Sequence, residues 1–259
     1  MLRPRIIPSL LISNSGLVKT IQFKDPKYVG DPINTVRIFN EKEVDELIVL
    51  DIDATTKGVE PNYDVIANLA AECRMPLCYG GGIKTAEHAN RIIGLGVEKI
   101  SLSSAAVENP QIITEIAQQI GNQSVVVVID VRTDGKKGTP TQYTHNGTKK
   151  VAGDPVEFAQ KMERLGAGEI VINNITNEGG MTGYDLDLVK RFRDVLNVPM
   201  TVLGGASKLD DLTELVQTFG VIGAAAGSIF VFKGRYRAVL VNYPQADRKL
   251  AITSASVLG

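Results

Sequence analysis

Two glycine-rich turns contain the residues whose types and spacing are best suited to bind an anion. The first lies in residues 76–85 (PLCYGGGIKT) and the second in residues 199–208 (PMTVLGGASK), and both run from a proline through an apolar run to glycines and a helix. Glycines at such a junction let backbone N–H groups approach a ligand, and the dipole of the following helix favours an anion. One Gly-Gly pair is also an ordinary strand-to-helix turn. Because the pattern occurs twice, the sequence predicts two phosphate sites.

The two copies extend beyond the glycines. Each is followed by a helix, a valine and a second turn of small residues, within residues 96–105 in the first copy and 220–228 in the second. Hydroxyl and backbone N–H groups are strong donors to phosphate oxygens. The chain is therefore predicted to consist of two similar halves, with one anion site in each half.

The composition disfavours two classes of partner. The chain has 259 residues, a hydrophobic fraction of 44% and a formal net charge of -1, so no basic field is available to hold nucleic acid. No run approaches the roughly 18 apolar residues of a membrane span. The first residues enter a predicted strand without a signal-peptide pattern, and there are only two cysteines. We expect a cytoplasmic protein without disulfides, whose partner is a small molecule or another protein.

Short β-branched runs alternate with helical stretches along the chain. Most runs are continuously apolar, as strands buried on both faces must be. The predicted strands are residues 6–12, 47–53, 76–79, 97–102, 125–131, 169–173, 200–203 and 221–225. Helical stretches between them, several with Ser, Thr or Asp at the start and Gly after the end, include residues 63–73, 85–95, 110–120, 155–165, 185–196 and 209–219.

Eight strands, each followed by a helix, predict an α/β fold of one domain over residues 1–259, since no linker interrupts the pattern. The expected architecture is a closed (βα)8 TIM barrel built from two similar half-barrels. The alternative is an open doubly wound sheet. The absence of a G-x-G-x-x-G motif after the first strand and the two-fold repeat both disfavour that sheet.

Two connections are longer than is usual in barrels. Residues 13–31, which include Lys19, Lys24 and Lys27, follow the first strand, and residues 132–153, with the hairpin-like TQYTHNGTKK, follow the fifth. Both leave from the carboxyl ends of strands, where barrels carry their active sites. The first is a plausible lid and the second a plausible rim, with surplus surface loop as the alternative for each. The three lysines either close over a phosphate or remain solvated.

The remaining reactive residue types lack sequence partners. Cys73 and Cys78 are spaced C-x4-C without a further ligand set, so buried packing is expected, and no metal or cofactor. His88 and His145 are far apart in sequence and on polar stretches, which favours surface positions over a catalytic pair. For His145, the alternative is a place over the mouth of the barrel.

Ten motifs spread over the chain carry a resemblance to a known family. They are RII at 5–7, VGDP at 29–32, DELIVLDID at 45–53, YGGGI at 79–83, EKISLSSAAVENP at 98–110, VVVVID at 125–130, NGTKK at 146–150, GAGEI at 166–170, TGYD at 182–185 and LGGA at 203–206. In these motifs the chain resembles the cyclase subunit of imidazole glycerol phosphate synthase, a HisF-like barrel of the ribulose-phosphate-binding type, essentially from end to end. The related isomerase of histidine biosynthesis is a poorer match.

The resemblance implies a barrel that receives ammonia from a glutaminase subunit docked at its bottom and uses it at the top on a substrate with two phosphates. It implies phosphate-binding residues at Gly81, Gly82, Ser103 and Ser104 in one half, and at Gly204, Gly205, Gly227 and Ser228 in the other. It also implies an ammonia gate at the barrel bottom, formed by Arg5, Glu46, Lys99 and Glu169. The alternative for this charged set is an ion-pair layer that only stabilises the barrel.

The sequence departs from the family at the residues that carry out the reaction. The family uses two aspartates as general acid and base, on the first and fifth strands. Asp130 matches the second, whereas Leu11 stands at the position of the first. Losing one member of an acid–base pair typically lowers the rate by about 10²–10⁴-fold. The sixth loop, residues 173–180, also lacks the aspartate that the family has near Thr176. Imidazole-ring closure is therefore disfavoured.

A paralogue of the cyclase subunit fits these departures better. The segments RPRIIPSLL and FKDPKYVGDP resemble a second copy that accompanies surface-polysaccharide gene sets and is implicated in converting an N-acetyl sugar group to an acetamidino group. Amidine formation also needs ammonia and an anionic substrate, for example a nucleotide sugar. Asp130 would then deprotonate ammonium or the attacking amine, with Asp51 and Asp53 orienting it. Alternatively, Asp53 caps the next loop and Asp51 holds a buried hydrogen bond.

Three functions are compatible with the sequence. The first is an ammonia-dependent synthase of the acetamidino type, the second a working imidazole glycerol phosphate synthase cyclase, and the third a non-catalytic barrel that binds and activates a glutaminase. Leu11 disfavours the second function. The presence of Asp130 and of two phosphate sites disfavours the third.

Overall fold

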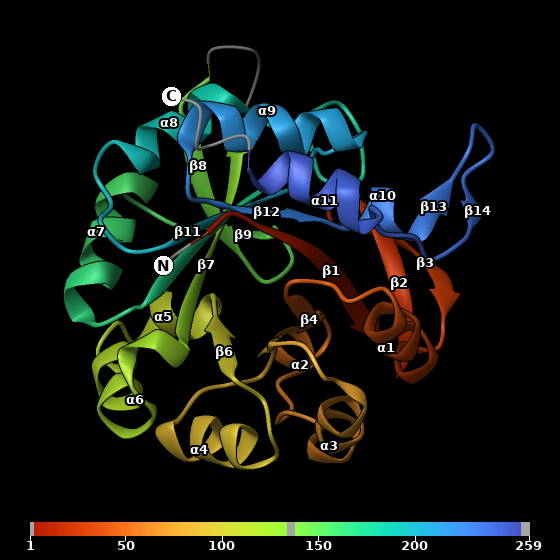
Figure 1. The fold of residues 1–259 in the computed structure, drawn as a ribbon. Coiled ribbons are helices and arrows are strands. Elements are labelled where there is room, and N and C mark those ends of the chain that lie inside the picture. The colour runs from red at the N-terminus through yellow and green to blue at the C-terminus, as the bar shows by residue number, and fades with distance from the viewer. Residues whose placement is uncertain (1–2, 134–137, 255–259) are drawn as a thin grey trace.

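Eight parallel strands form a ring that closes on itself (Figure 1). The computed structural model describes residues 3–133 and 138–254. The described part therefore excludes residues 1–2 and 255–259 of the predicted domain and residues 134–137 of the predicted rim. The ring closes because β10 pairs with β7, and β12 with β1. The barrel strands are β1 (Arg5–Ser13), β4 (Leu47–Asp51), β5 (Leu77–Gly80), β6 (Lys99–Leu102), β7 (Val125–Thr133), β10 (Glu169–Asn174), β11 (Met200–Leu203) and β12 (Gly223–Ala226). The predicted TIM barrel is confirmed.

Helices surround the ring in the described chain (Figure 1). The longer ones are α1 (Pro32–Glu41), α3 (Tyr63–Glu72), α4 (Ala86–Gly94), α6 (Ile112–Ile120), α7 (Pro155–Leu165), α8 (Leu186–Arg193), α9 (Leu209–Phe219) and α11 (Ala246–Thr253). Single turns, α2 (Ala54–Lys57), α5 (Ser104–Glu108), α10 (Ser228–Val231) and the 3-10 turn η1 (Asn122–Ser124), complete the connections. Several helices begin where a side-chain oxygen accepts the N–H of the third helical residue, which contributes about 1 kcal/mol per cap; these caps are Asp31, Asn62, Thr85 and Asp185.

Each half-barrel begins with a strand that continues into an antiparallel hairpin. The lid hairpin, β2 (Gly16–Ile21) and β3 (Lys24–Gly30), pairs with β1, and the rim hairpin, β8 (Pro140–Thr144) and β9 (Lys149–Lys150), pairs with β7. Leu11 pairs with Val18 in the first, and Asp130 pairs with Tyr143 in the second. The hairpin in residues 132–153 is therefore confirmed where it is described. Residues 13–31, expected as a loop, are instead mostly strand, and a third hairpin joins β13 (Phe232–Lys233) to β14 (Ala238–Val239).

Two apolar clusters make the core. The larger lies between the strands and the helices, and the smaller holds alternate residues of the strands, which point into the barrel. The inner cluster consists of Ile7, Ile48, Cys78, Val126, Val128, Val171, Leu203 and Ala225, with Leu50 packed against it. The barrel interior is therefore filled by apolar side chains and is not an open pore.

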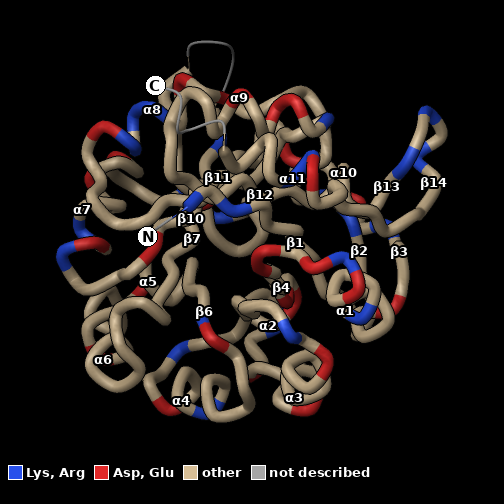
Figure 2. The backbone as a smooth tube through the Cα atoms, in the orientation of Figure 1, with Lys and Arg blue, Asp and Glu red and all other residues tan. Residues whose placement is uncertain are grey.

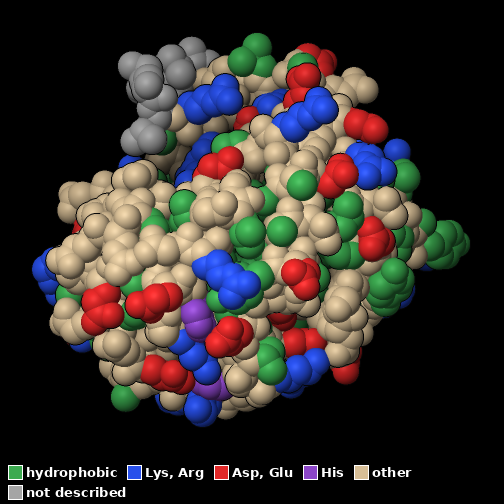
Figure 3. All heavy atoms as spheres, turned by 90° about the horizontal axis from the view of Figure 1, so that it is seen from below, with side chains coloured by type: hydrophobic (Ala, Val, Ile, Leu, Met, Phe, Trp, Pro, Cys, Tyr) green, Lys and Arg blue, Asp and Glu red, His purple; other side chains and the backbone are tan. Residues whose placement is uncertain are grey.

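The outer surface carries charges of both signs. Lys and Arg, and Asp and Glu, are scattered over the outside of the barrel (Figure 2), and the face in Figure 3 mixes acidic, basic and apolar side chains. Within residues 3–133 and 138–254, no helix is both long enough and apolar enough to cross a membrane.

Candidate active site

A buried carboxyl group lines the cavity at the barrel mouth. Asp130, near the carboxyl end of β7, accepts hydrogen bonds from Asn173 Nδ2 at 2.8 Å and from Ser103 Oγ at 3.2 Å. Burial raises the pKa of Asp130 to about 6, although both hydrogen bonds act to lower it. A carboxyl group with a pKa near neutral pH is suited to take up and release protons during a reaction.

Leu11 lies on the opposite side of the same cavity. In the ring of strands β1 and β7 are separated by three strands, so Leu11 and Asp130 belong to opposite walls, and both line one hollow, called here the first cavity. The β-hairpin pairing makes the two residues equivalent in the two half-barrels. The first cavity therefore has a titratable carboxyl group on one wall and an apolar group at the matching place on the other.

The two aspartates at the end of β4 have different surroundings. Asp51 lines the first cavity, and its Oδ1 accepts the N–H groups of Asp53 at 2.9 Å and Ala54 at 3.1 Å. Burial raises its pKa despite these bonds. The Asp53 carboxylate instead accepts from Asn14 N and Lys57 Nζ, both at 2.9 Å, and holds the turn between β1 and β2. Asp51 is thus near the reacting region while also ordering the turn, whereas Asp53 has a structural place.

The four residues expected to bind the first phosphate also line the first cavity: Gly81, Gly82, Ser103 and Ser104. Gly81 has φ +123°, and a Cβ atom there would lie 2.4 Å from the Asp51 carbonyl oxygen. Only glycine fits this position, so the backbone can run close to the end of β4 and turn its groups toward the cavity.

The other four, Gly204, Gly205, Gly227 and Ser228, line an adjacent hollow, the second cavity. Gly204 and Gly205 have φ +96° and +116°, and a Cβ atom on Gly205 would lie 2.1 Å from the Gly183 carbonyl oxygen. The two cavities share Leu11, Phe23 and Asn173 in their walls. A ligand that reaches both cavities therefore passes over these three side chains.

Lys19 lines the second cavity. From the sequence, this lysine was expected either to bind a phosphate or to be solvated. It is buried, and its Nζ donates to the Ser9 carbonyl oxygen at 2.7 Å. Burial lowers its pKa to about 8, while nearby Glu178 acts in the opposite direction. A Cβ atom on Gly227 would lie 2.2 Å from this amine. The apolar neighbours in the run LVKTI were the signal that this lysine belongs to a strand.

Glu178 holds the lid hairpin against the sixth loop. Its carboxylate accepts from Thr20 Oγ1 at 2.9 Å and from Phe23 N at 3.0 Å, and its backbone carbonyl accepts from Gln22 N at 3.0 Å. Glu178 also lines the second cavity. The sixth loop, which lacks an aspartate near Thr176, thus still supplies a carboxylate at the barrel mouth.

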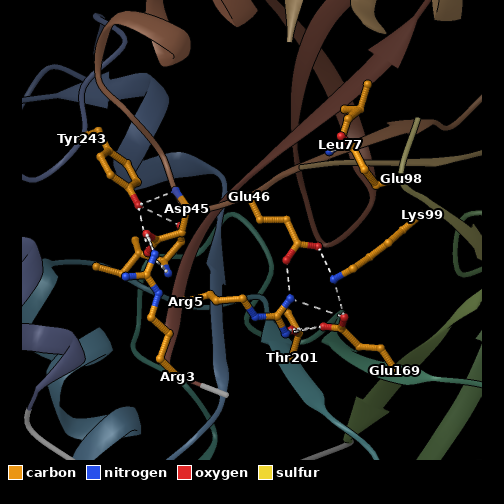
Figure 4. Close-up of polar contacts among 11 residues, drawn as sticks. Arg3, Arg5, Asp45, Glu46, Leu77, Glu98, Lys99, Glu169, Thr201 and Tyr243 are labelled. Carbon is orange, nitrogen blue, oxygen red and sulfur yellow. Dashed lines mark hydrogen bonds and ion pairs between the residues drawn. The ribbon is translucent and has the colours of Figure 1, made fainter. Parts of the chain in front are cut away.

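The charged residues at the opposite end of the barrel form a closed ring (Figure 4). Lys99 Nζ lies 2.8 Å from Glu46 Oε1 and 2.8 Å from Glu169 Oε2, while Arg5 Nη2 lies 2.8 Å from Glu169 Oε1 and Arg5 Nη1 contacts Glu46 Oε2. Thr201 Oγ1 adds a bond of 2.6 Å to Glu169. Positive and negative groups alternate around the ring, so its formal charges cancel.

Mutual pairing keeps this ring ionised. The side chains of Glu46 and Glu169 are only 4% and 6% exposed. Burial by itself would raise the pKa of Glu169, but the charges of Arg5 and Lys99 outweigh burial and hold that pKa well below its usual range. Because each carboxylate has two cationic neighbours, removal of one cation leaves a buried charge incompletely compensated.

The comparison with known protein families decides the assignment. The family described as histidine biosynthesis protein matches residues 5–237. The chain belongs to this family. Two relatives bear the name "Putative imidazole glycerol phosphate synthase subunit": hisF3 of Vibrio vulnificus is 57% identical over 249 residues (96% of each chain), and hisF2 of Pseudomonas aeruginosa is 51% identical over 248 residues (96% of this chain, 98% of the relative). Imidazole glycerol phosphate synthase subunit HisF of Exiguobacterium sibiricum is 39% identical over 230 residues, 89% of this chain and 91% of the relative.

Membership of the histidine biosynthesis family confirms the resemblance and the enzyme class predicted from the motifs, a synthase of the imidazole glycerol phosphate synthase type. Among the described residues, no group of three or more His, Cys, Asp or Glu side chains is arranged to hold a metal ion.

Proposed function

We propose that this chain is the synthase subunit of a glutamine amidotransferase, which uses ammonia released by a glutaminase partner to form an acetamidino group on a phosphorylated sugar, such as a nucleotide sugar, for a surface polysaccharide. The glutaminase docks at the barrel bottom, around the ring of Arg5, Glu46, Lys99 and Glu169 and the adjacent Glu98. The substrate binds at the opposite end, with its anionic groups in the two cavities.

One observation carries this proposal: a charge-balanced ring and a fully buried carboxyl group, Asp130, lie at opposite ends of one apolar interior. Neutral ammonia can pass apolar side chains, whereas ammonium would have to lose its hydration. Along the wall, Ser101 is buried, lines the first cavity, and its Oγ has no hydrogen-bond partner among the described residues. This hydroxyl is available to a small polar molecule that leaves the interior beside Asp130.

The reaction needs one nucleophile and proton transfers at one carbon atom. Ammonia adds to the carbonyl carbon of the N-acetyl group, the carbonyl oxygen departs as water, and the carbon keeps the new nitrogen as an amidine. Asp130 takes a proton from the attacking nitrogen and gives it to the carbonyl oxygen, which becomes a hydroxyl group. A second transfer of the same kind, again from nitrogen to oxygen, lets that hydroxyl group leave as water. Leu11 is tolerated because no second, opposing acid is required, in contrast to imidazole-ring closure.

The direct test is to identify the product. We expect that the chain, incubated with its glutaminase, ¹⁵N-amide glutamine and a nucleotide-linked N-acetyl sugar, forms a product in which one ¹⁵N replaces the carbonyl oxygen, as detected by mass spectrometry. A reaction without the sugar measures glutaminase alone. If no candidate acceptor gains ¹⁵N while glutaminase activity is enhanced, the non-catalytic, activating role replaces the synthase.

The two anion sites are part of this proposal, and a glycine substitution tests the second. Gly205→Ala is expected to abolish the thermal stabilisation that phosphate gives through this site, because the added Cβ meets the Gly183 carbonyl oxygen and a left-handed conformation strains a side chain by about 1–3 kcal/mol. Gly94→Ala is the matched control, since nothing lies within 4 Å of its Cβ position and its helix favours alanine. Equal phosphate responses in both variants would contradict the site.

The runner-up function, imidazole-ring closure, is tested at Leu11. We expect the native chain to turn over the histidine-pathway substrate far below an authentic cyclase subunit, and Leu11→Asp to raise any residual rate by about 10²-fold or more. The measurement is the rate of cyclisation with external ammonia. Leu11→Asn is the control, because it adds polarity without a proton-transferring group. A native rate equal to that of an authentic cyclase would reject the acetamidino proposal.

A further inference from the structure

The tip of the rim hairpin is fixed across the barrel mouth. His145 and Asn146 have φ values of +52° and +55°, a left-handed conformation that residues with a side chain keep only where the surrounding structure holds them in it. Asn146 Nδ2 donates to the Ile52 carbonyl oxygen at 2.8 Å, next to the end of β4. Arg132 Nη2 donates to the Gly147 carbonyl oxygen at 3.3 Å. The tip is thus held from both β4 and β7.

This attachment places His145 beside the first anion site. Its backbone N–H points to Ser104 Oγ at 3.5 Å, and the residue lines the first cavity together with Gly82 and Ser103. Its ring Nδ1 lies 3.1 Å from Thr144 Oγ1, and its side chain is 20% exposed. The residue therefore borders the cavity while part of its side chain is exposed, and no role in the proposed proton transfer uses it.

Charged groups from several elements surround the ring. Its Nε2 lies 3.7 Å from Glu108 Oε1, on α5, and 3.4 Å from Lys149 Nζ, on β9. Asp51 of β4 and Asp130 of β7 line the same cavity. Three carboxyl groups and one lysine therefore make up the charged surroundings of the ring.

We propose that His145 is a positioning residue of the first anion site, whose imidazolium closes over an oxyanion held by Gly82 and Ser104. This inference rests on the proposed function, which places a phosphate of the substrate there. Glu108 is an acidic neighbour of the ring, and a bound anion supplies a further negative group. His145 thereby selects a substrate that carries a negative group at this end and makes its binding tighter at lower pH.

Sulfate is a suitable probe because it keeps its charge over the pH range in which histidine titrates. We would measure sulfate affinity by calorimetry at pH 5.5 and 7.0, in an Asp130→Asn background that removes a cavity carboxyl group with a pKa of about 6. Lys19 of the second cavity keeps its charge at both values, because its pKa is about 8.

The chain has only two histidines. His145→Asn keeps a residue that accepts a left-handed backbone, and His88→Gln, on α4, is the matched control.

We expect sulfate to bind about two- to threefold more tightly at pH 5.5 than at pH 7.0, the change that follows if the charged ring binds about fivefold better than the neutral one. His145→Asn should remove this pH dependence, and His88→Gln should retain it. Two results would overturn the role of His145 while leaving the anion site valid. In the first, the pH dependence of sulfate binding survives His145→Asn; in the second, sulfate binds without any pH dependence. Failure of sulfate to bind at all contradicts the anion site, and with it the proposal.

Discussion

Replacing Asp130 by asparagine is expected to lower product formation by about 10²–10⁴-fold, the usual loss when a general acid–base group is removed. Asparagine has the same shape and can keep hydrogen bonds with Asn173 and Ser103, so the cavity should remain intact. Glutamine hydrolysis by the partner should change little. The measurement is the ratio of product formed to glutamine hydrolysed in the reconstituted pair. An unchanged ratio would show that Asp130 does not transfer protons.

The pH profile gives a second readout of the same variant. If Asp130 acts as a base, the native rate should fall as the pH drops through about 6, and the residual rate of Asp130→Asn should lack this acidic limb. The effect on stability has the opposite direction. Because the folded pKa lies above the ordinary value of 3.8, the folded state binds the proton more readily, and stability is lost as the pH rises from about 4 to about 6.

Asp130→Asn should therefore be more stable than the native chain above pH 6, by up to about 3 kcal/mol, and nearly equal to it below pH 4. Asp53→Asn is the contrasting control. Burial would raise the Asp53 pKa, but bonds from Lys57, Asn14 and Ser13 lower it, so this substitution should destabilise the fold at neutral pH. Denaturant unfolding at pH 4 and pH 8 compares the two. A loss of stability in Asp130→Asn at pH 8 would contradict the assigned environment.

Lys99→Met is expected to lower glutamine-dependent product formation about tenfold or more relative to the rate with high external ammonia, which corresponds to a loss of roughly 1.4 kcal/mol in coupling. The substitution leaves the buried carboxylates Glu46 and Glu169 with Arg5 as their only cationic partner in the ring. The unbalanced ring should rearrange, and it should destabilise the barrel by about 3–5 kcal/mol, as measured by denaturant unfolding.

The double variant Lys99→Met with Glu46→Gln is the matched control. It leaves Arg5 paired with Glu169 at 2.8 Å, so the formal charge of the ring is again zero. Most of the lost stability should return. Coupling should return only in part, because the ring no longer consists of four alternating charges. If Lys99→Met lowers the rates with glutamine and with ammonia equally, the ring stabilises the barrel and does not admit ammonia.

The amino-acid sequence by itself determined the barrel and the positions of its glycine turns. Eight apolar runs of strand length, each followed by an amphipathic stretch, can bury their faces in few other ways, and this pattern is local. The left-handed conformations at Gly81 and Gly205 likewise follow from residue type, since the turn at the end of each strand needs a residue without a Cβ atom. Leu11, at the place of a proton-transferring group, was also visible without coordinates.

Only the tertiary structure decided which side chains meet and how they ionise. Arg5 and Glu169 are 164 residues apart, and their contact depends on closure of the ring between β10 and β7 and between β12 and β1. The burial of Lys19 and its pKa depend on the lid hairpin, which Glu178 holds from the other half of the chain. Such contacts depend on which residues of distant strands lie side by side and on how far their side chains are removed from water. The spacing of residues in the sequence gives neither. The pKa of Asp130 and the place of His145 over the first cavity have the same origin.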